Sequence, residues 1–302
     1  MIAFLMLVGP GEAQIATDTL FHCLRLYPGS YAFIRDDSTS DGTFSALAQF
    51  AAEHAPRVLL ERNTHPQGYL GVAVSIFQAY DSLGNRPLDI EMIIELDPDT
   101  CILRSGLVEL ARKKFAEFGP GIIGSYRLSL EGGKRDHGPH RRCMLRDLLP
   151  VGTDQKTNRR RMGFPFYLRY LPRAFVQGYR LGEHVLAALY ILHGDTFREL
   201  GRRGFWHSMP PEGSRYVKMD DPLVSLGAKF VGHSLIDIND PSHGEIPAWL
   251  QYLPPIQWTA EEIVHNGYLA VHPLKRDEQG TKLRNEIRSL LNRNEARLAP
   301  PA

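Results

Sequence analysis

Short apolar runs alternate with longer segments of helical periodicity along the first 125 residues of this chain. We predict strands at 4–8, 31–34, 57–60 and 90–96, and helices at 13–27, 43–54, 72–83 and 107–118. This alternation is typical of an α/β protein with a mainly parallel central sheet flanked by helices. Ligands of such sheets bind beyond the carboxyl ends of the strands. The loops that follow the four strands are therefore expected to meet at one edge.

The alternation weakens after residue 122. We expect a strand at 122–130, helices at 185–200 and 222–226, and a charged amphipathic helix at 282–298. The chain is therefore interpreted as one continuous domain of two halves, residues 1–125 and residues 126–302, the second including the C-terminal helix.

The composition argues against several classes of protein. Lys and Arg total 35 against 34 Asp and Glu, so a globally basic nucleic-acid binder is not expected. Cys23, Cys101 and Cys143 form no CxxC pair and indicate neither a zinc site nor a disulfide framework. The apolar start lacks a basic leader and is interrupted at Gly9 and Pro10, which argues against a signal peptide or membrane span. We expect a cytoplasmic protein.

Two acids, Asp97 and Asp99, flank Pro98 directly after the apolar run at 90–96. Two carboxylates that leave a strand together repel each other unless a cation joins them. Carboxylate sites of this kind suit Mg²⁺ or Mn²⁺, especially where phosphate oxygens complete the coordination. The alternative is a turn with two solvated acids.

A second polar loop, Asp36-Asp37-Ser38-Thr39-Ser40-Asp41-Gly42-Thr43, follows the second predicted strand. Its acids and hydroxyls could hydrogen-bond a base or a ribose. Asp41 and Thr43 are equally well explained as caps of the next helix. Asp36 and Asp37 are not explained by capping and are the informative pair.

Four motifs in order resemble the nucleotide-binding half of GT-A glycosyltransferases, in particular the family 2 group. They are the Val8-Gly9-Pro10 turn, the acidic loop at 36–43, the segment at 61–71 with Asn63 and Gly68, and Asp97-Pro98-Asp99. The resemblance implies a GT-A fold in which 1–125 binds a nucleotide-sugar donor and 126–302 binds an acceptor. It also implies transfer of a sugar, with UDP the favoured nucleotide, to an acceptor hydroxyl.

The resemblance assigns roles to residues of the donor half. Pro10 would lie in the turn beside the nucleotide, and one of Asp36 and Asp37 would accept a hydrogen bond from the base. Asp99, helped by Asp97, would hold Mn²⁺ or Mg²⁺ on the diphosphate. Arg62 would add a diphosphate or base contact, although a solvated loop arginine is an equal alternative.

Further roles fall in the second half. Lys218-Met219-Asp220-Asp221-Pro222 resembles the Glu-Asp motif near the acceptor, whose Asp is the base in inverting members. Asp220 stands where the family usually has Glu, so either acid could be the base, and Asp221 could instead be a helix N-cap. After a strand-like run, His272 would complete the metal shell and Lys275 would contact the diphosphate.

The segment 134–180 carries twelve basic residues against three acidic ones, interleaved with aromatic residues. We expect it to border the acceptor site and to attract an anionic carbohydrate or small-molecule acceptor, or a membrane surface, by peripheral contact at most. The alternative is a solvated loop that closes over the donor.

Three other functions are alternatives to glycosyl transfer. A sugar-nucleotide nucleotidyltransferase is disfavoured because the turn after the first strand, Gly9-Pro10-Gly11-Glu12-Ala13, has no nearby Lys or Arg. An NAD-binding domain is disfavoured because Gln14 replaces the small residue that its glycine motif needs. A non-catalytic nucleotide-sugar-binding protein of the same fold stays open.

Overall fold

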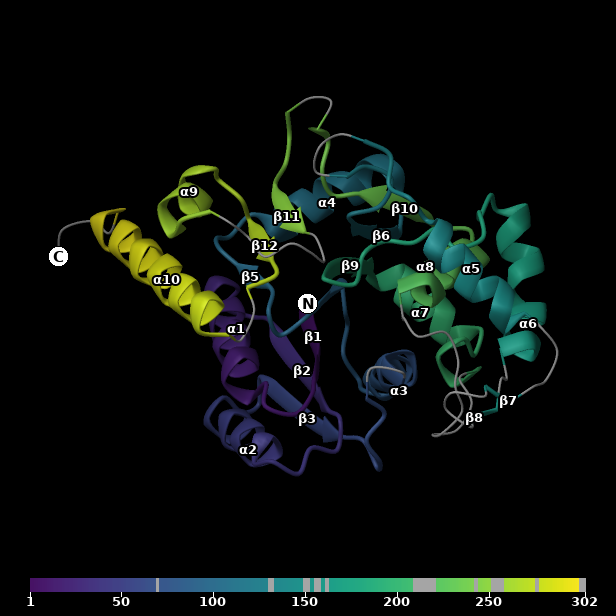
Figure 1. The fold of residues 1–302 in the computed structure, drawn as a ribbon, viewed down its shortest axis with the longest axis horizontal. Helices are drawn as coiled ribbons and strands as arrows, with labels where there is room; N and C mark the ends of the chain where they lie inside the picture. Colours follow the sequence, from purple (N-terminus) through teal and green to yellow (C-terminus); the bar gives the residue numbers. More distant parts are fainter. Residues whose placement is uncertain are drawn as a thin grey trace.

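A seven-stranded sheet forms the centre of the protein (Figure 1). The computed structural model describes residues 1–68, 71–129, 133–148, 153–154, 159–160, 163–208, 221–241, 244–250, 258–274 and 277–298. The strands, in spatial order, are β10 (Ser234–Asp237), β6 (Gly121–Gly124), β9 (Leu189–His193), β4 (Met92–Leu96), β1 (Ile2–Val8), β2 (Tyr31–Asp36) and β3 (Val58–Arg62). All pairs are parallel except those of β9, which runs antiparallel to β4 and β6.

Helices cover both faces of this sheet. One face packs against α1 (Ala13–Leu26), α2 (Thr43–Glu53) and α4 (Leu107–Phe118). The other packs against α3 (Val72–Gly84), α6 (Gly163–Val176), α7 (Gly194–Arg202) and α8 (Asp221–Phe230). Successive β1 side chains point to opposite faces of the sheet, because the strand is pleated. Phe4 packs in the core on the first face and Leu5 in the core on the second. The predicted α/β class, with a mainly parallel sheet flanked by helices, is confirmed.

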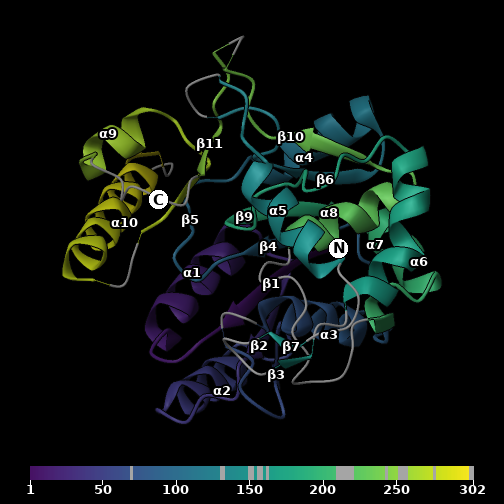
Figure 2. The ribbon, with the colours of Figure 1, turned by 45° about the vertical axis from the view of Figure 1, so that its right-hand side comes forward.

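A smaller region lies beside α1 (Figure 2). It holds the three-stranded sheet β11 (Ala248–Leu250), β12 (Ala270–His272) and β5 (Cys101–Ile102), with α9 (Ala260–His265) and α10 (Glu278–Leu298). The remaining named elements are α5 (Gly138–Asp147), β7 (Thr153–Asp154), β8 (Arg159–Arg160) and the 3-10 turn η2 (Trp206–Ser208). Among the described residues, no helix has the length and apolar character of a membrane span.

The helix predicted at 185–200 is wrong, because its first part is the buried strand β9 and α7 begins only at Gly194. A short apolar run can be read as a buried helix or a buried strand, since periodicity does not separate them. Gly194 marks the real boundary: a Cβ there would lie 2.1 Å from the carbonyl oxygen of Ile90. The strand predicted at 122–130 ends early, at Gly124, because the next amides of Tyr126 and Arg127 donate to Asp237 instead of a sheet neighbour.

Candidate functional site

The loops after β1, β2, β3 and β4 share one edge of the sheet, as expected, because these four strands are parallel. Backbone hydrogen bonds join the first three loops. The Asp37 amide donates to the Val8 carbonyl over 3.0 Å, and the Asn63 amide donates to the Asp36 carbonyl over 2.9 Å. Side chains at the ends of strands far apart in the sequence are thereby held on a common rim.

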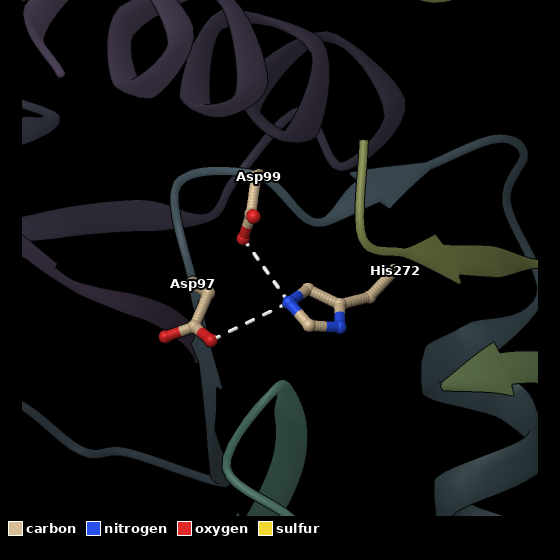
Figure 3. Close-up of side chains that lie close together, drawn as sticks. All are labelled: Asp97, Asp99 and His272. Carbon is tan, nitrogen blue, oxygen red and sulfur yellow. Dashed lines mark ion pairs between the residues drawn. The ribbon is translucent and has the colours of Figure 1, made fainter. Parts of the chain in front are cut away.

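Asp97, Asp99 and His272 converge at this rim (Figure 3). Nε2 of His272 lies 3.1 Å from Oδ1 of Asp99 and 3.6 Å from Oδ2 of Asp97. The histidine is 2% exposed, whereas the side chains of Asp97 and Asp99 are 41% and 16% exposed. One face of the group is therefore buried in the protein and the other is open to a ligand.

The local fold explains why these three residues meet. The acids belong to the turn between β4 and β5, closed by a 3.0 Å hydrogen bond from the Thr100 amide to the Asp97 carbonyl. His272 ends β12, which pairs antiparallel with β5. The Leu274 amide then donates to the Asp99 carbonyl over 2.8 Å. The small sheet thus carries a histidine from the second half of the chain to acids of the first.

The donor set suits a divalent cation. One atom from each side chain can be chosen so that all lie within 4.8 Å of one another. Around an octahedral ion with bonds of about 2.1 Å, adjacent ligand atoms are about 3 Å apart. The separations of 3.1 and 3.6 Å at His272 Nε2 are close to that requirement. Two carboxylates and one imidazole leave other coordination positions for phosphate oxygens or water.

A buried arginine, Arg284 of α10, connects the turn that carries Asp97 and Asp99 to the segment that follows His272. Its Nη1 donates to Thr19 Oγ1 over 2.7 Å and its Nη2 donates to the Leu274 carbonyl over 2.9 Å. The Thr19 hydroxyl in turn lies 3.0 Å from the Pro98 carbonyl and 3.2 Å from that of Thr100. Arg284 is 3% exposed, and burial lowers its pKa. One guanidinium therefore supports both the acidic turn and the segment that follows His272.

The two acids of the second loop have different surroundings. Asp36 is fully buried, accepts from the Thr39 amide at 3.1 Å and hydroxyl at 2.6 Å, and pairs with Arg62 at 3.2 Å. Asp37 is half-buried and accepts from the amides of Gln67 at 2.8 Å and Gly68 at 2.7 Å. Asp36 thus organises its own loop, and Asp37 holds the loop after β3 against it.

Arg62 and Pro10 lie on the same rim. The Arg62 side chain, 41% exposed, donates to the Thr39 carbonyl and has its guanidinium carbon 4.6 Å from the centre of the Phe44 ring. Pro10 is exposed after β1, next to Gly11, whose amide donates to Thr43 Oγ1 over 3.1 Å. The base and diphosphate contacts assigned to these residues stay predictions.

Asp221, the first residue of α8, is 1% exposed and lies near a cluster of histidines. The rings of His140 and His184 are 3.9 Å apart, and Arg135 Nη2 is 3.2 Å from His184 Nε2. Burial, aided by the charges of its neighbours, lowers the pKa of His184 to about 2 and that of His137 to about 4. Burial also lowers the pKa of His140, although the charge of Asp221 acts in the opposite direction.

The segment before β9 connects this cluster to the acidic turn. The Val185 amide donates to Ser225 Oγ of α8 over 3.0 Å. Three residues further on, the Ala188 carbonyl accepts from the Asp97 amide at 3.3 Å and from Thr100 Oγ1 at 2.5 Å. Three residues span at most about 11 Å. The middle of α8 and the candidate metal site are thus joined by a short segment of main chain.

Two predicted site residues, Asp220 and Lys275, lie outside the described residues. Sequence reasoning missed Thr19 and Arg284, which are 265 positions apart and share no motif. It also missed the grouping of His137, His140 and His184. The interleaving of histidine with arginine at 135–142 was the available signal for that cluster.

No protein-family model and no curated protein matches the chain. Among solved structures it is similar to the mannosyltransferase PcManGT from Pyrobaculum calidifontis, in complex with GDP-Man and Mn²⁺, at 12% identity and a TM-score of 0.46, covering 100% of this chain and 65% of that one. It is also similar to the galactosyltransferase LgtC, in complex with donor and acceptor sugar analogues, at 12% identity and 0.46, covering 94% and 95%. Mouse xyloside xylosyltransferase 1 gives 12% identity and 0.43, covering 92% and 99%.

These proteins are of the kind that the sequence motifs resemble. Each TM-score lies below 0.5.

Proposed function

We propose that this chain is a metal-dependent glycosyltransferase that moves a sugar from a UDP-linked donor to an acceptor hydroxyl. The observation that carries the proposal is the convergence of Asp97, Asp99 and His272 at the carboxyl edge of a mainly parallel sheet. A cation held there could bind a diphosphate, and the loops after β1, β2 and β3 lie on the same rim to receive a nucleoside.

Asp97, Asp99 and His272 would hold the cation, with Mn²⁺ favoured over Mg²⁺. Mg²⁺ prefers oxygen ligands, whereas Mn²⁺ also accepts an imidazole nitrogen. When bound, the cation would neutralise charge on the departing nucleoside diphosphate. The burial of His272 would fix the ring, and the exposed side of Asp97 would leave room for the diphosphate.

The donor nucleoside is proposed to lie across the loops after β1 and β2. Of the two acids named for the base, Asp37 is the better placed, because Asp36 is fully buried whereas Asp37 is only half-buried. Pro10 would border the nucleoside, and Arg62 and Lys275 would contact the diphosphate.

On the acceptor side we propose Asp221 as the base, with Asp220 as its alternative, in an inverting displacement at the anomeric carbon. A base at this position has to lie within hydrogen-bond reach of the acceptor hydroxyl. Support comes from its place at the start of α8, close to His140, which is partly buried. Because Asp221 is 1% exposed, neighbouring side chains would have to move before an acceptor could reach it.

A thermal-shift panel tests the donor and metal assignments together. UDP, GDP and ADP would each be added with Mn²⁺, with Mg²⁺ and with EDTA. A ligand at one hundred times its dissociation constant stabilises a protein by about 2.7 kcal/mol. We expect a rise in Tm with UDP and Mn²⁺ that EDTA abolishes.

Asp99→Asn should lose that shift while Asp89→Asn keeps it. Asp89 is the matched control, because its side chain is fully exposed and lies outside the group. A shift with UDP that persists in EDTA, or that survives Asp99→Asn, would show that the metal group does not bind the donor. If the nucleotide binds as expected, hydrolysis of the corresponding nucleotide-sugar would distinguish an enzyme from a binding protein.

A further inference from the structure

Exposed apolar side chains concentrate on two neighbouring helices of the second half. Leu145 of α5 is 49% exposed, and Leu168, Phe175 and Val176 of α6 are 63%, 47% and 84% exposed. Within the described part of the chain, the other large apolar residues exposed to this degree are isolated ones on α1 and α4. Scattered exposed apolar residues are ordinary, whereas a concentration of them indicates a contact surface.

The charged residues on these helices are almost all arginines. Arg169 and Arg173 are exposed on α6, whose sequence holds no acidic residue. On α5 the exposed charges are Arg141, Arg142 and Arg146, and Asp147 ends the helix. The exposed surface therefore combines apolar side chains with a local excess of positive charge, although the chain as a whole has a formal charge of only +1.

The two helices are held to the same part of the molecule. Tyr179, just after α6, donates its hydroxyl to Met144 Sδ of α5 over 3.6 Å. The same Tyr179 ring stacks against Phe175 at 6.3 Å between centres. The last turn of α6 therefore lies close to α5, at the end of the molecule opposite α10 (Figures 1 and 2).

One face of α6 packs into the core, and the opposite face is exposed. Phe166, Tyr167 and Tyr170 are buried in the core on the face of the sheet that α3 also covers. Arg173 lies over the Phe230 ring, 5.5 Å from its centre, so its stem covers apolar surface while the guanidinium stays exposed. One side of the helix is thus packed in the core. The other side is exposed and carries both apolar and cationic side chains.

We propose that this outer surface, formed by Leu145, Leu168, Phe175 and Val176 with the arginines of α5 and α6, docks the protein on an anionic lipid membrane. Charge complementarity selects the partner: arginines pair with lipid phosphates and carboxylates, and the leucine, phenylalanine and valine side chains enter the boundary between headgroups and acyl chains. A nucleic acid would pair with the arginines and could stack on Phe175, but it would make no use of the exposed Leu168 and Val176. The inference is independent of the proposed glycosyl transfer.

The test is binding of the full chain to sedimented vesicles. Neutral phosphatidylcholine vesicles would be compared with vesicles containing phosphatidylserine, at low and at physiological salt. We expect binding to the anionic vesicles only, weakened by salt because surface charges are screened. Each neutralised arginine should lower the partition coefficient about fivefold.

Arg169→Gln with Arg173→Gln should therefore reduce binding about 25-fold, and Leu168→Ser with Val176→Ser should also reduce it. Matched controls are Arg112→Gln with Arg202→Gln, two exposed arginines elsewhere, and Phe118→Ser, an exposed apolar residue on α4. The controls should bind like the unaltered chain. Circular dichroism spectra should be unchanged in every variant.

Equal binding by the α6 variants and the controls would overturn the proposal, as would failure to bind anionic vesicles at low salt. Tighter binding to single-stranded RNA than to vesicles, unaffected by Leu168→Ser with Val176→Ser, would also overturn it in favour of a nucleic-acid surface.

Discussion

Replacing Arg284 by methionine should weaken cation binding although Arg284 is not a ligand. The substitution keeps a long apolar side chain but removes the guanidinium that joins Thr19 Oγ1 to the Leu274 carbonyl. Thr19 supports the turn that carries Asp97 and Asp99. Loss of the guanidinium therefore removes a hydrogen bond that supports the acidic turn and another that supports the segment after His272. All three proposed metal ligands are kept.

The magnitude follows from two charge-assisted hydrogen bonds of 2.7 and 2.9 Å. Each such bond contributes about 1.5–3 kcal/mol. The cost of burying the cation, which lowers the pKa of Arg284, offsets part of this contribution. We expect the free energy of unfolding to fall by about 2 kcal/mol. Groups that orient metal ligands typically change affinity about 10- to 100-fold, so a loss of that size is expected for Mn²⁺.

Calorimetric titration with Mn²⁺, together with denaturant unfolding, measures both effects. Arg284→Lys should recover part of the stability but little of the affinity, because an ammonium group cannot match the planar two-pronged contact. Arg288→Gln is the control on the same helix, since Arg288 pairs with Asp18 at 2.8 Å outside the group. A folded Arg284→Met protein that binds Mn²⁺ as tightly as the unaltered chain would refute the positioning role.

Three further predictions concern the acids and the histidines. Asp221→Asn should lower kcat by about 10²- to 10⁴-fold and leave donor KM nearly unchanged; a normal rate, or a product that keeps the donor's anomeric configuration, would contradict the base assignment. Asp36→Asn should lower the free energy of unfolding by about 2 kcal/mol in denaturant melts, because an amide nitrogen cannot accept a hydrogen bond from Thr39 as the carboxylate oxygen it replaces does; an unchanged melt would contradict that. The pKa values of His184 and His137 lie at about 2 and about 4 in the folded protein, below the usual histidine value, so the unfolded chain takes up protons first as pH falls below about 6.5. Stability should then fall with pH from about 6.5 towards 4, and His137→Gln should reduce that slope; equal slopes would show that folding does not lower the pKa of His137.

The sequence was sufficient where local signals agreed with the fold. The helix predicted at 107–118 is α4 (Leu107–Phe118), because Gly106 and Gly119 bound it with φ of +115° and +77°, values that favour glycine. The convergence of the strand-end loops was also predictable, since it follows from parallel strands alone. Asp97 and Asp99 could be named because a proline between two acids at a strand end is a visible pattern.

Other parts of the site depend on long-range packing. The burial of Asp36, and hence its structural role beside Arg62, is not visible in a run of polar residues. Arg284 belongs to a helix whose sequence looks like a solvated charged surface, and only its docking on α1 shows that this arginine is buried. The β9 strand was misread because its apolar run has no periodicity that distinguishes it from a buried helix.

Electron spin echo spectroscopy of the Mn²⁺-loaded protein tests the central claim most directly. If His272 ligates the ion beside Asp97 and Asp99, the spectrum should show nuclear modulation from one imidazole nitrogen, and UDP should add phosphorus modulation. His272→Ala should lose the nitrogen signal, whereas His265→Ala, a change in α9 outside the group, should keep it. An unaltered protein without nitrogen modulation, or a His272→Ala protein that retains it, would contradict the proposed metal site.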